Sequence, residues 1–139
     1  MDLIAIAIEN PDQKDYHFIL ATGEENTPVG YACFGPTPLT RGTYTLYWIA
    51  VDPACSGQGI GTLLLQWVEA EIIDWKGHMI VLETSSSPDY AQTRHFYEKN
   101  GYSLVESIPD FYQEGEDRVT FLKKLGKSNV LIRSPLIPP

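Results

Sequence analysis

The sequence of 139 residues predicts a single α/β domain, and three observations lead to this fold class. Its length suits about one domain, and 43% hydrophobic with 20% charged residues is typical of a globular chain. Most apolar residues form short β-prone runs, but after Ile60 they recur every three or four residues, as in a helix. A glycine-rich segment, Gly57 to Gly61, lies where the strand pattern changes to the helix pattern.

The first half of the chain is predicted to consist of antiparallel strands. Residues 16–22 and 29–34 are β-prone runs around a polar stretch with Gly, Asn and Pro, which favours a hairpin. Residues 43–51 are rich in Thr, aromatic and β-branched residues, so they predict a long strand that ends at Asp52-Pro53.

The second half is predicted to contain two helices. An amphipathic stripe predicts a helix that Gly77 ends. The stripe consists of Ile60, Leu63, Leu64, Trp67, Val68, Ile72 and Trp75. The second helix is predicted to begin near Pro88, which suits the first helical position after a capping Ser87, and to close at residues 100–101.

Three further strands complete the predicted pattern. Residues 79–82 form a short apolar run between the two helices, and residues 102–108 and 118–125 are β-prone. Residues 109–117 are predicted to be a turn-rich segment, aromatic and acidic, that could receive a cation or simply be a solvated turn. The order is therefore β-β-β-α-β-α-β-β.

Charge and composition exclude several classes of function. The net charge of −8 repels phosphate backbones and anionic lipid, so neither nucleic acid nor a membrane surface is an expected partner. Two cysteines without a CxxC pattern, and histidines without ligand spacing, predict no disulfide framework and no metal site. No apolar run near the start approaches the ~20 residues of a membrane span, and a cytoplasmic location is expected.

The glycine segment suits an anion. Glycine lets the backbone curl so that amide groups converge at the positive end of the helix dipole. Thr62 stands where a dinucleotide fingerprint has its third glycine, and the segment lacks the lysine of an NTPase loop, so both of those sites are excluded. A turn that only allows close helix packing remains an alternative.

Two motifs resemble a known family. Residues 48–53 (WIAVDP) followed by residues 57–64 (GQGIGTLL) resemble the acetyl-CoA motif of the GNAT family of N-acetyltransferases. Residues 94–102 (RHFYEKNGY) are similar to that family's helix with the catalytic tyrosine. The resemblance runs from about residue 16 to 125, within a domain expected at 1–125 and followed by a tail at 126–139. It implies a mixed, mostly antiparallel twisted sheet with flanking helices, and acetyl-CoA as acyl donor without a metal.

The resemblance also implies which residues contact acetyl-CoA. The loop amides would bind the diphosphate, and the strand at residues 49–51 would splay from its neighbour and leave amides free for the developing oxyanion. The implied cofactor-binding residues are Ile49, Ala50, Val51, Ser56, Gly57, Gln58, Gly59, Ile60, Gly61, Thr62, Tyr90 and Arg94. Ser56 departs from the family's usual Arg or Gln, and Tyr90 departs from an asparagine.

Two residues are the candidates for proton transfer. An alkyl ammonium with a pKa of ~10 must lose a proton before it attacks, which requires a base. Glu83 stands where N-terminal acetyltransferases of ribosomal proteins, a branch of the family, place theirs, although an exposed strand-end glutamate is the alternative. Tyr97 is expected to protonate the departing thiolate, and its alternative is a ring that only packs on the sheet. Cys55 as a nucleophile is disfavoured, because no histidine or acid is paired with it by spacing.

Together these residues predict an N-acetyltransferase that works by direct attack in a ternary complex. The acceptor would be a small amine or a peptide amino group, and the net charge favours cationic amines. A non-catalytic module that senses acyl-CoA or a nucleotide is the alternative.

The two ends of the chain fit the family least well. Few residues precede the first hairpin, and the resemblance predicts the end of a helix at residues 3–9, although the residues alternate as in a strand. The sheet edge would then need a cover. The β-prone run at residues 130–132 could pair with an edge of its own sheet or, in a homodimer, of a second copy; a disordered end is the alternative.

Overall fold

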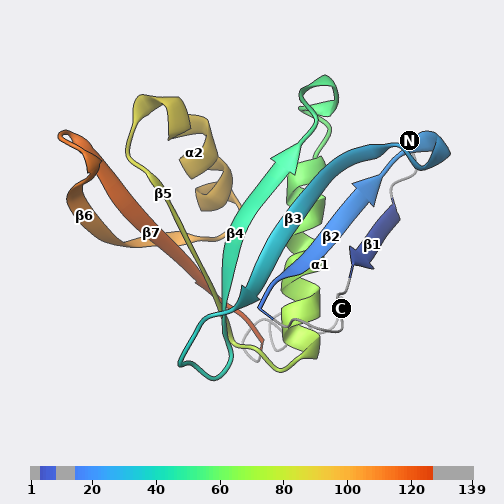
Figure 1. The fold of residues 1–139 in the computed structure, drawn as a ribbon, viewed down its shortest axis with the longest axis horizontal. Coiled ribbons are helices and arrows are strands. Elements are labelled where there is room, and N and C mark those ends of the chain that lie inside the picture. Colours follow the sequence, from blue (N-terminus) through green and yellow to red (C-terminus); the bar gives the residue numbers. More distant parts are fainter. Residues whose placement is uncertain (1–3, 9–14, 127–139) are drawn as a thin grey trace.

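The computed structural model describes residues 4–8 and 15–126, in which seven strands form one sheet with the order β1-β2-β3-β4-β5-β7-β6 (Figure 1). The strands are β1 (Ile4–Ile8), β2 (His17–Thr22), β3 (Pro28–Pro36), β4 (Thr43–Val51), β5 (Met79–Ser85), β6 (Ser103–Gln113) and β7 (Glu116–Lys124). The helices are α1 (Ile60–Asp74) and α2 (Ala91–Lys99). Only β4 and β5 pair in parallel among these strands, so the predicted mixed, mostly antiparallel sheet is confirmed.

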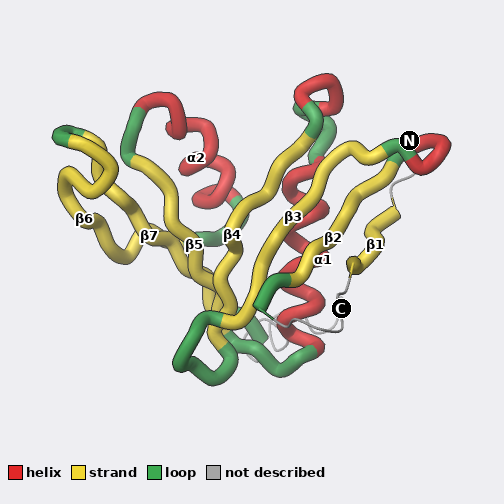
Figure 2. The backbone as a smooth tube through the Cα atoms, viewed as in Figure 1, coloured by secondary structure: helices red, strands yellow, loops and turns green. Residues whose placement is uncertain are grey.

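The sheet opens between β4 and β5, which share only three residue pairs before they diverge (Figure 2). These pairs are Thr43 with Met79, Tyr44 with Ile80, and Thr45 with Val81. Just beyond them β4 has a bulge at Tyr47. Cys33 of β3 pairs with Trp48, but the next residue, Phe34, pairs with Leu46. A bulge bends its strand, so this one accompanies the turn of β4 away from β5.

Helix α1 covers one face of β2, β3 and β4 (Figure 1). Its residues Leu64, Val68 and Ile72 are fully buried, and burial of such side chains stabilises the fold by about 1.5–3 kcal/mol each. The close approach depends on Gly30 of β3, where a Cβ would lie 2.8 Å from the carbonyl oxygen of Ala50 and 3.1 Å from Leu64 Cδ1. The apolar stripe predicted from the sequence is thus the buried face of α1.

The chain between β5 and α2 differs slightly from the prediction. Residues Pro88–Tyr90 form a 3-10 turn, and the α-helix begins only at Ala91. The Ser87 side chain caps this turn by accepting a hydrogen bond from the Asp89 amide at 3.2 Å. The predicted serine cap is confirmed, but it caps the turn that precedes α2.

The prediction of a turn-rich segment at residues 109–117 is wrong. Strand β6 continues to Gln113, and only residues 114–115 form the turn before β7. Pro109 is tolerated because β6 is an edge strand, where a missing amide need not break a ladder. Asp110 has a positive φ of 57°, and its carboxylate accepts a hydrogen bond from the Gly115 amide at 2.8 Å, which steadies this irregular stretch.

The prediction of a helix at the N-terminal end is also wrong. Residues Ile4–Ile8 form β1, which pairs antiparallel with β2 from Ile4 opposite Thr22 to Ile8 opposite Phe18. The alternating apolar pattern therefore indicated the correct structure. Strand β1 covers the edge of β2 that would otherwise be exposed. The run at residues 130–132 lies outside the described residues, so its role stays a prediction. Over the described ranges, the helices are too short or too polar to cross a bilayer.

Candidate active site

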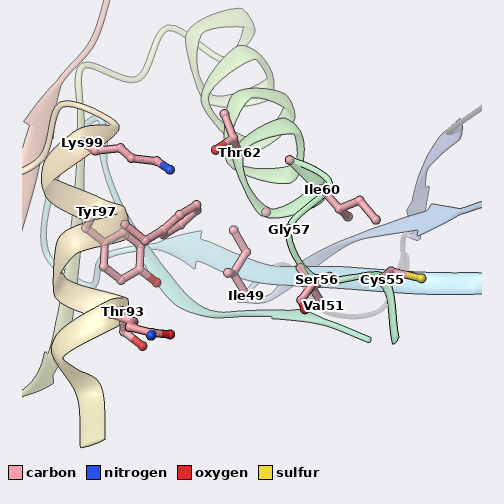
Figure 3. A pocket seen from close by; sticks show the side chains of 14 residues that line it. Ile49, Val51, Cys55, Ser56, Gly57, Ile60, Thr62, Thr93, Tyr97 and Lys99 are labelled. Atoms are coloured by element: carbon pink, nitrogen blue, oxygen red, sulfur yellow. The ribbon is translucent and has the colours of Figure 1, made fainter. Parts of the chain in front are cut away.

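A cavity of about 360 Å³ lies where the two sequence motifs meet (Figure 3). It is bounded by the outer part of β4, the loop and first turn of α1, and one face of α2. The lining residues are Ile49, Val51, Cys55, Ser56, Gly57, Gly59, Ile60, Gly61, Thr62, Gln92, Thr93, Phe96, Tyr97 and Lys99. The fold thus brings the glycine loop and Tyr97 to one site.

Two of the loop glycines are required by backbone conformation. Gly57 and Gly59 have φ angles of +82° and +79°, and Gly59 is the left-handed residue directly before α1. A Cβ at either position would meet no atom within 4 Å, so close helix packing does not explain them. Gly61 is different, because a Cβ there would lie 3.3 Å from the Phe96 ring. The loop therefore combines a left-handed turn that opens toward the cavity with one close packing contact.

The first turn of α1 presents amide groups at this loop. The amides of residues 60–62 have no acceptor inside the helix, because they belong to its first turn. They lie at the positive end of the helix dipole, which favours a negatively charged group. This geometry suits an anionic group, and the binding of a diphosphate here stays a prediction of the loop motif.

The wall formed by β4 offers a free strand edge. Ile49 and Val51 line the cavity, and they lie beyond Thr45, the last residue of β4 that pairs with β5. Ala50 between them is exposed and is absent from the lining, in keeping with the alternation of side chains along a strand. Within the described residues, this part of β4 therefore does not pair with β5. The predicted separation of residues 49–51 from the neighbouring strand is confirmed.

Tyr97 both packs in the core and reaches the cavity. Its side chain is 6% exposed, and its ring lies 5.3 Å from Phe96, 5.9 Å from Tyr102 and 6.3 Å from Phe121 between centroids. Figure 3 shows the ring projecting from α2 toward Ile49 of β4. Burial raises the pKa of Tyr97 to about 12, so the hydroxyl keeps its proton at neutral pH.

Helix α2 contributes residues that the sequence reasoning did not single out. Gln92, Phe96 and Lys99 line the cavity at helical spacing, and Thr93 lies one turn before Tyr97. Lys99 supplies a positive charge to the cavity. The loop itself does not, because Ser56 is uncharged. The spacing of these residues around Tyr97 was the signal that could have identified them.

Arg94 and Tyr90, both expected to contact the cofactor, lie elsewhere. The Arg94 guanidinium donates hydrogen bonds to the carbonyl oxygens of Ser85 at 2.7 Å and Ser87 at 2.8 Å. It therefore holds the start of α2 to the end of β5 and is absent from the cavity lining. Gln58 is also absent from the lining, although its neighbours Gly57 and Gly59 are part of it.

Glu83 lies in a second cavity of about 320 Å³, which Tyr90 also lines. The full lining is Glu83, Thr84, Ser85, Tyr90, Tyr112 and Glu116. The Glu83 side chain is 50% exposed, and its Oε2 lies 3.4 Å from Nη1 of Arg118. The two candidates for proton transfer, Glu83 and Tyr97, thus line different cavities.

His17 and the two cysteines are packed among other side chains. The His17 ring lies 4.8 Å from Trp75 and 5.6 Å from Phe34 between centroids. Cys33 is buried, and burial raises the pKa of its thiol. Cys55 is half-buried and lines the same cavity as Tyr97. Residues 4–8 and 15–126 contain no group of three or more side chains arranged to hold a metal ion.

The described geometry agrees with comparisons to known proteins. A family model described as an acetyltransferase (GNAT) domain matches residues 14–104. An uncharacterized N-acetyltransferase of Methanocaldococcus jannaschii is 38% identical over 90 residues, which are 64% of this chain and 54% of that protein. S-(2-succino)cysteine N-acetyltransferase of Bacillus subtilis is 32% identical over 69 residues, 50% of this chain and 42% of that protein. The chain spans about half the length of these curated relatives.

Solved structures show the same fold. A crystal structure described as an acetyltransferase of the GNAT family from Desulfovibrio desulfuricans has a TM-score of 0.77 and 42% identity, covering 79% of this chain and 69% of that one. The ribosomal-protein-S18-alanine N-acetyltransferase of Escherichia coli has a TM-score of 0.71 at 22% identity, covering 83% of this chain and 72% of that one. At that identity the likeness concerns the fold alone. Because the family model matches well over half of the chain, this chain belongs to the GNAT acetyltransferase family.

Proposed function

We propose that the chain transfers an acetyl group from acetyl-CoA to a primary amine by direct attack in a ternary complex. The observation that carries the proposal is the cavity in which the α1 loop, the free edge of β4 and Tyr97 meet, which we call the cofactor cavity. The loop offers amides for the diphosphate, the strand edge offers amides beside the thioester, and Tyr97 offers a proton. Each part of the transfer therefore has a group of the right chemistry.

The cofactor would be held mainly by backbone groups. The amides of residues 58–62 would bind the diphosphate at the positive end of α1, with Lys99 adding a positive charge from α2. The free edge of β4 would receive the rest of the CoA chain and place the thioester near Tyr97. Amides of residues 49–51 would then donate to the carbonyl oxygen as it gains charge.

The reaction requires proton transfers at both the acceptor nitrogen and the sulfur. Glu83 would take a proton from the acceptor ammonium, and the neutral nitrogen would attack the thioester carbonyl carbon. The C–N bond forms, the C–S bond breaks, and the sulfur would take a proton from Tyr97. The nitrogen would then pass its second proton to the Tyr97 phenolate, and Glu83 would release its proton to solvent, which restores both side chains. The high pKa of Tyr97 ensures that the proton is present, and its hydrogen bond to sulfur strengthens as the sulfur gains negative charge.

The test is steady-state release of CoA with a panel of primary amines. Tyr97→Phe should lower kcat by ~10²–10⁴-fold while the Kd for acetyl-CoA stays nearly the same, because general acid–base groups contribute in this range. Glu83→Gln should also lower kcat, and Tyr31→Phe, an exposed ring on β3, is the matched control. Unchanged turnover in both active-site variants would contradict the assigned roles. Acetyl-CoA binding without turnover of any amine would favour the sensing module.

A further inference from the structure

We propose that the second cavity, lined by Glu83, Thr84, Ser85, Tyr90, Tyr112 and Glu116, binds a cationic group of the acceptor, with Glu116 as its anchor. The acceptor is then an amine that carries a second positive charge, as a diamine does. This inference rests on the proposed function, because it names the substrate class of the same enzyme.

The second cavity lies at the end of β5, beyond the three residues of β5 that pair with β4. Leu82 of β5 is buried and pairs with Phe121 of β7, whose ring lies 6.3 Å from Tyr97 of α2. Side chains alternate along a strand, so Glu83 and Ser85 point to the other face of the sheet. An acceptor in this cavity would therefore approach from the face that α2 does not cover.

The two carboxylates of this cavity differ in their partners. Glu83 forms an ion pair with Arg118 at 3.4 Å. Glu116 instead accepts hydrogen bonds from uncharged donors, Ser85 Oγ at 2.5 Å and Gln113 Nε2 at 2.9 Å. Within the described residues, no lysine, arginine or histidine lies within ion-pair distance of Glu116. Its negative charge is therefore available to a bound cation.

Two tyrosines give the cavity a surface that suits a cation. Tyr90 and Tyr112 are 46% and 48% exposed, so their rings are accessible to a ligand. Aromatic rings attract ammonium groups through their negative faces. Burial raises the pKa of Tyr112, and the neighbouring carboxylates of Glu83 and Glu116 raise it further while Arg118 lowers it. Two accessible rings and two carboxylates thus line one cavity, which suits a cationic group.

The spacing of the carboxylates indicates the length of the acceptor. Glu83 and Ser85 lie two residues apart on β5, which corresponds to about 6–7 Å along a strand. Glu116 is hydrogen-bonded to Ser85, so the anchor lies about one such step from the proposed base. This span is comparable to that between the nitrogens of extended 1,4-diaminobutane. One amine could thus lie at Glu83 while the other contacts Glu116.

The experiment compares 1,4-diaminobutane with n-butylamine, which lacks the second charge. Calorimetry on the CoA-bound protein should show at least tenfold tighter binding of the diamine. Glu116→Gln, which keeps the size of the side chain, should remove this preference and leave the affinities for n-butylamine and CoA unchanged. Glu114→Gln is the matched control, because this exposed glutamate lies in the adjacent turn and outside the cavity lining. It should keep the preference.

Several outcomes would overturn the inference. These are equal affinities of the two amines for the unmodified protein, an equal loss of both affinities in Glu116→Gln, or the same loss of preference in Glu114→Gln. Circular dichroism and thermal melting of each variant identify a folding defect, and Glu116→Asp then provides a second test by retaining the charge and the preference. Failure of the proposed function is seen separately, as tighter binding of the diamine than of n-butylamine without turnover of acetyl-CoA.

Discussion

The two cavities are built in different ways. The cofactor cavity depends on a continuous segment, residues 49–62, whose contribution is mostly backbone, and on one face of α2. The second cavity depends on side chains from β5, the turn before α2, β6 and β7. The site proposed for acetyl-CoA is therefore encoded locally, whereas the site proposed for the acceptor depends on how distant strands pair.

The largest effect is expected from a change in the glycine loop. Gly59→Asp should lower acetyl-CoA affinity by at least 100-fold, because it strains a φ of +79° and places a carboxylate where the diphosphate would bind. Calorimetry measures the loss. The matched control is Gly115→Asp, which has a φ of +86° in the turn between β6 and β7. If Gly59→Asp binds acetyl-CoA as the unmodified protein does, the loop is not the diphosphate site.

A smaller effect is expected on the pH dependence of stability, from the buried phenol of Tyr97 in the cofactor cavity. Tyr97 has a folded-state pKa of about 12 against about 10 when unfolded, so its stabilising contribution is complete below pH 10. Stability should then fall by about 1.4 kcal/mol per pH unit as the pH rises from 10 to 12, because only the unfolded state ionises. Urea unfolding of Tyr97→Phe across this range should show a smaller fall than the unmodified protein. Parallel pH curves for the two proteins would contradict this.

The smallest effect concerns the support behind the cofactor cavity. The Tyr102 hydroxyl donates to Glu69 Oε2 at 2.7 Å, and Lys123 Nζ lies 3.2 Å from the same carboxylate group, which links α1 to β7. Tyr102→Phe should lower the free energy of unfolding by about 1.5 kcal/mol, the lower end of the range for a hydrogen bond to a charged group. Urea unfolding at neutral pH measures it. A change no larger than that of the surface variant Tyr31→Phe would show that this link does not stabilise the fold.

Sequence patterns predicted the fold where local signals agree. The bounds of β4 and the start of α1 follow directly from the residue types at 43–51 and at Ile60. The helix expected at residues 3–9 was wrong because the resemblance was preferred over an alternating pattern that pairs with β2. Strand β6 was predicted too short because a proline such as Pro109 is typical of the end of a strand. An edge strand such as β6 tolerates a proline, so the strand continues beyond it.

The candidate site was predictable only in part for a related reason. The glycine loop and Tyr97 lie in motifs that can be recognised locally, but the bulge at Tyr47 depends on the register of β3 against β4. Glu116 could not be singled out, because its position beside Ser85 follows from the pairing of β5 with β7. Arg94 was assigned to the cofactor, yet its guanidinium donates to the carbonyl oxygens of Ser85 and Ser87, which lie between the end of β5 and the start of α2.

The most direct measurement is a crystal structure of the protein with CoA. It should show the diphosphate within hydrogen-bond distance of the amides of residues 58–62, and the sulfur between β4 and β5. The sulfur should lie within about 3–4 Å of the Tyr97 hydroxyl, or be joined to it by one water. A CoA molecule bound away from the α1 loop, or one whose sulfur does not enter the split, would contradict the proposed site.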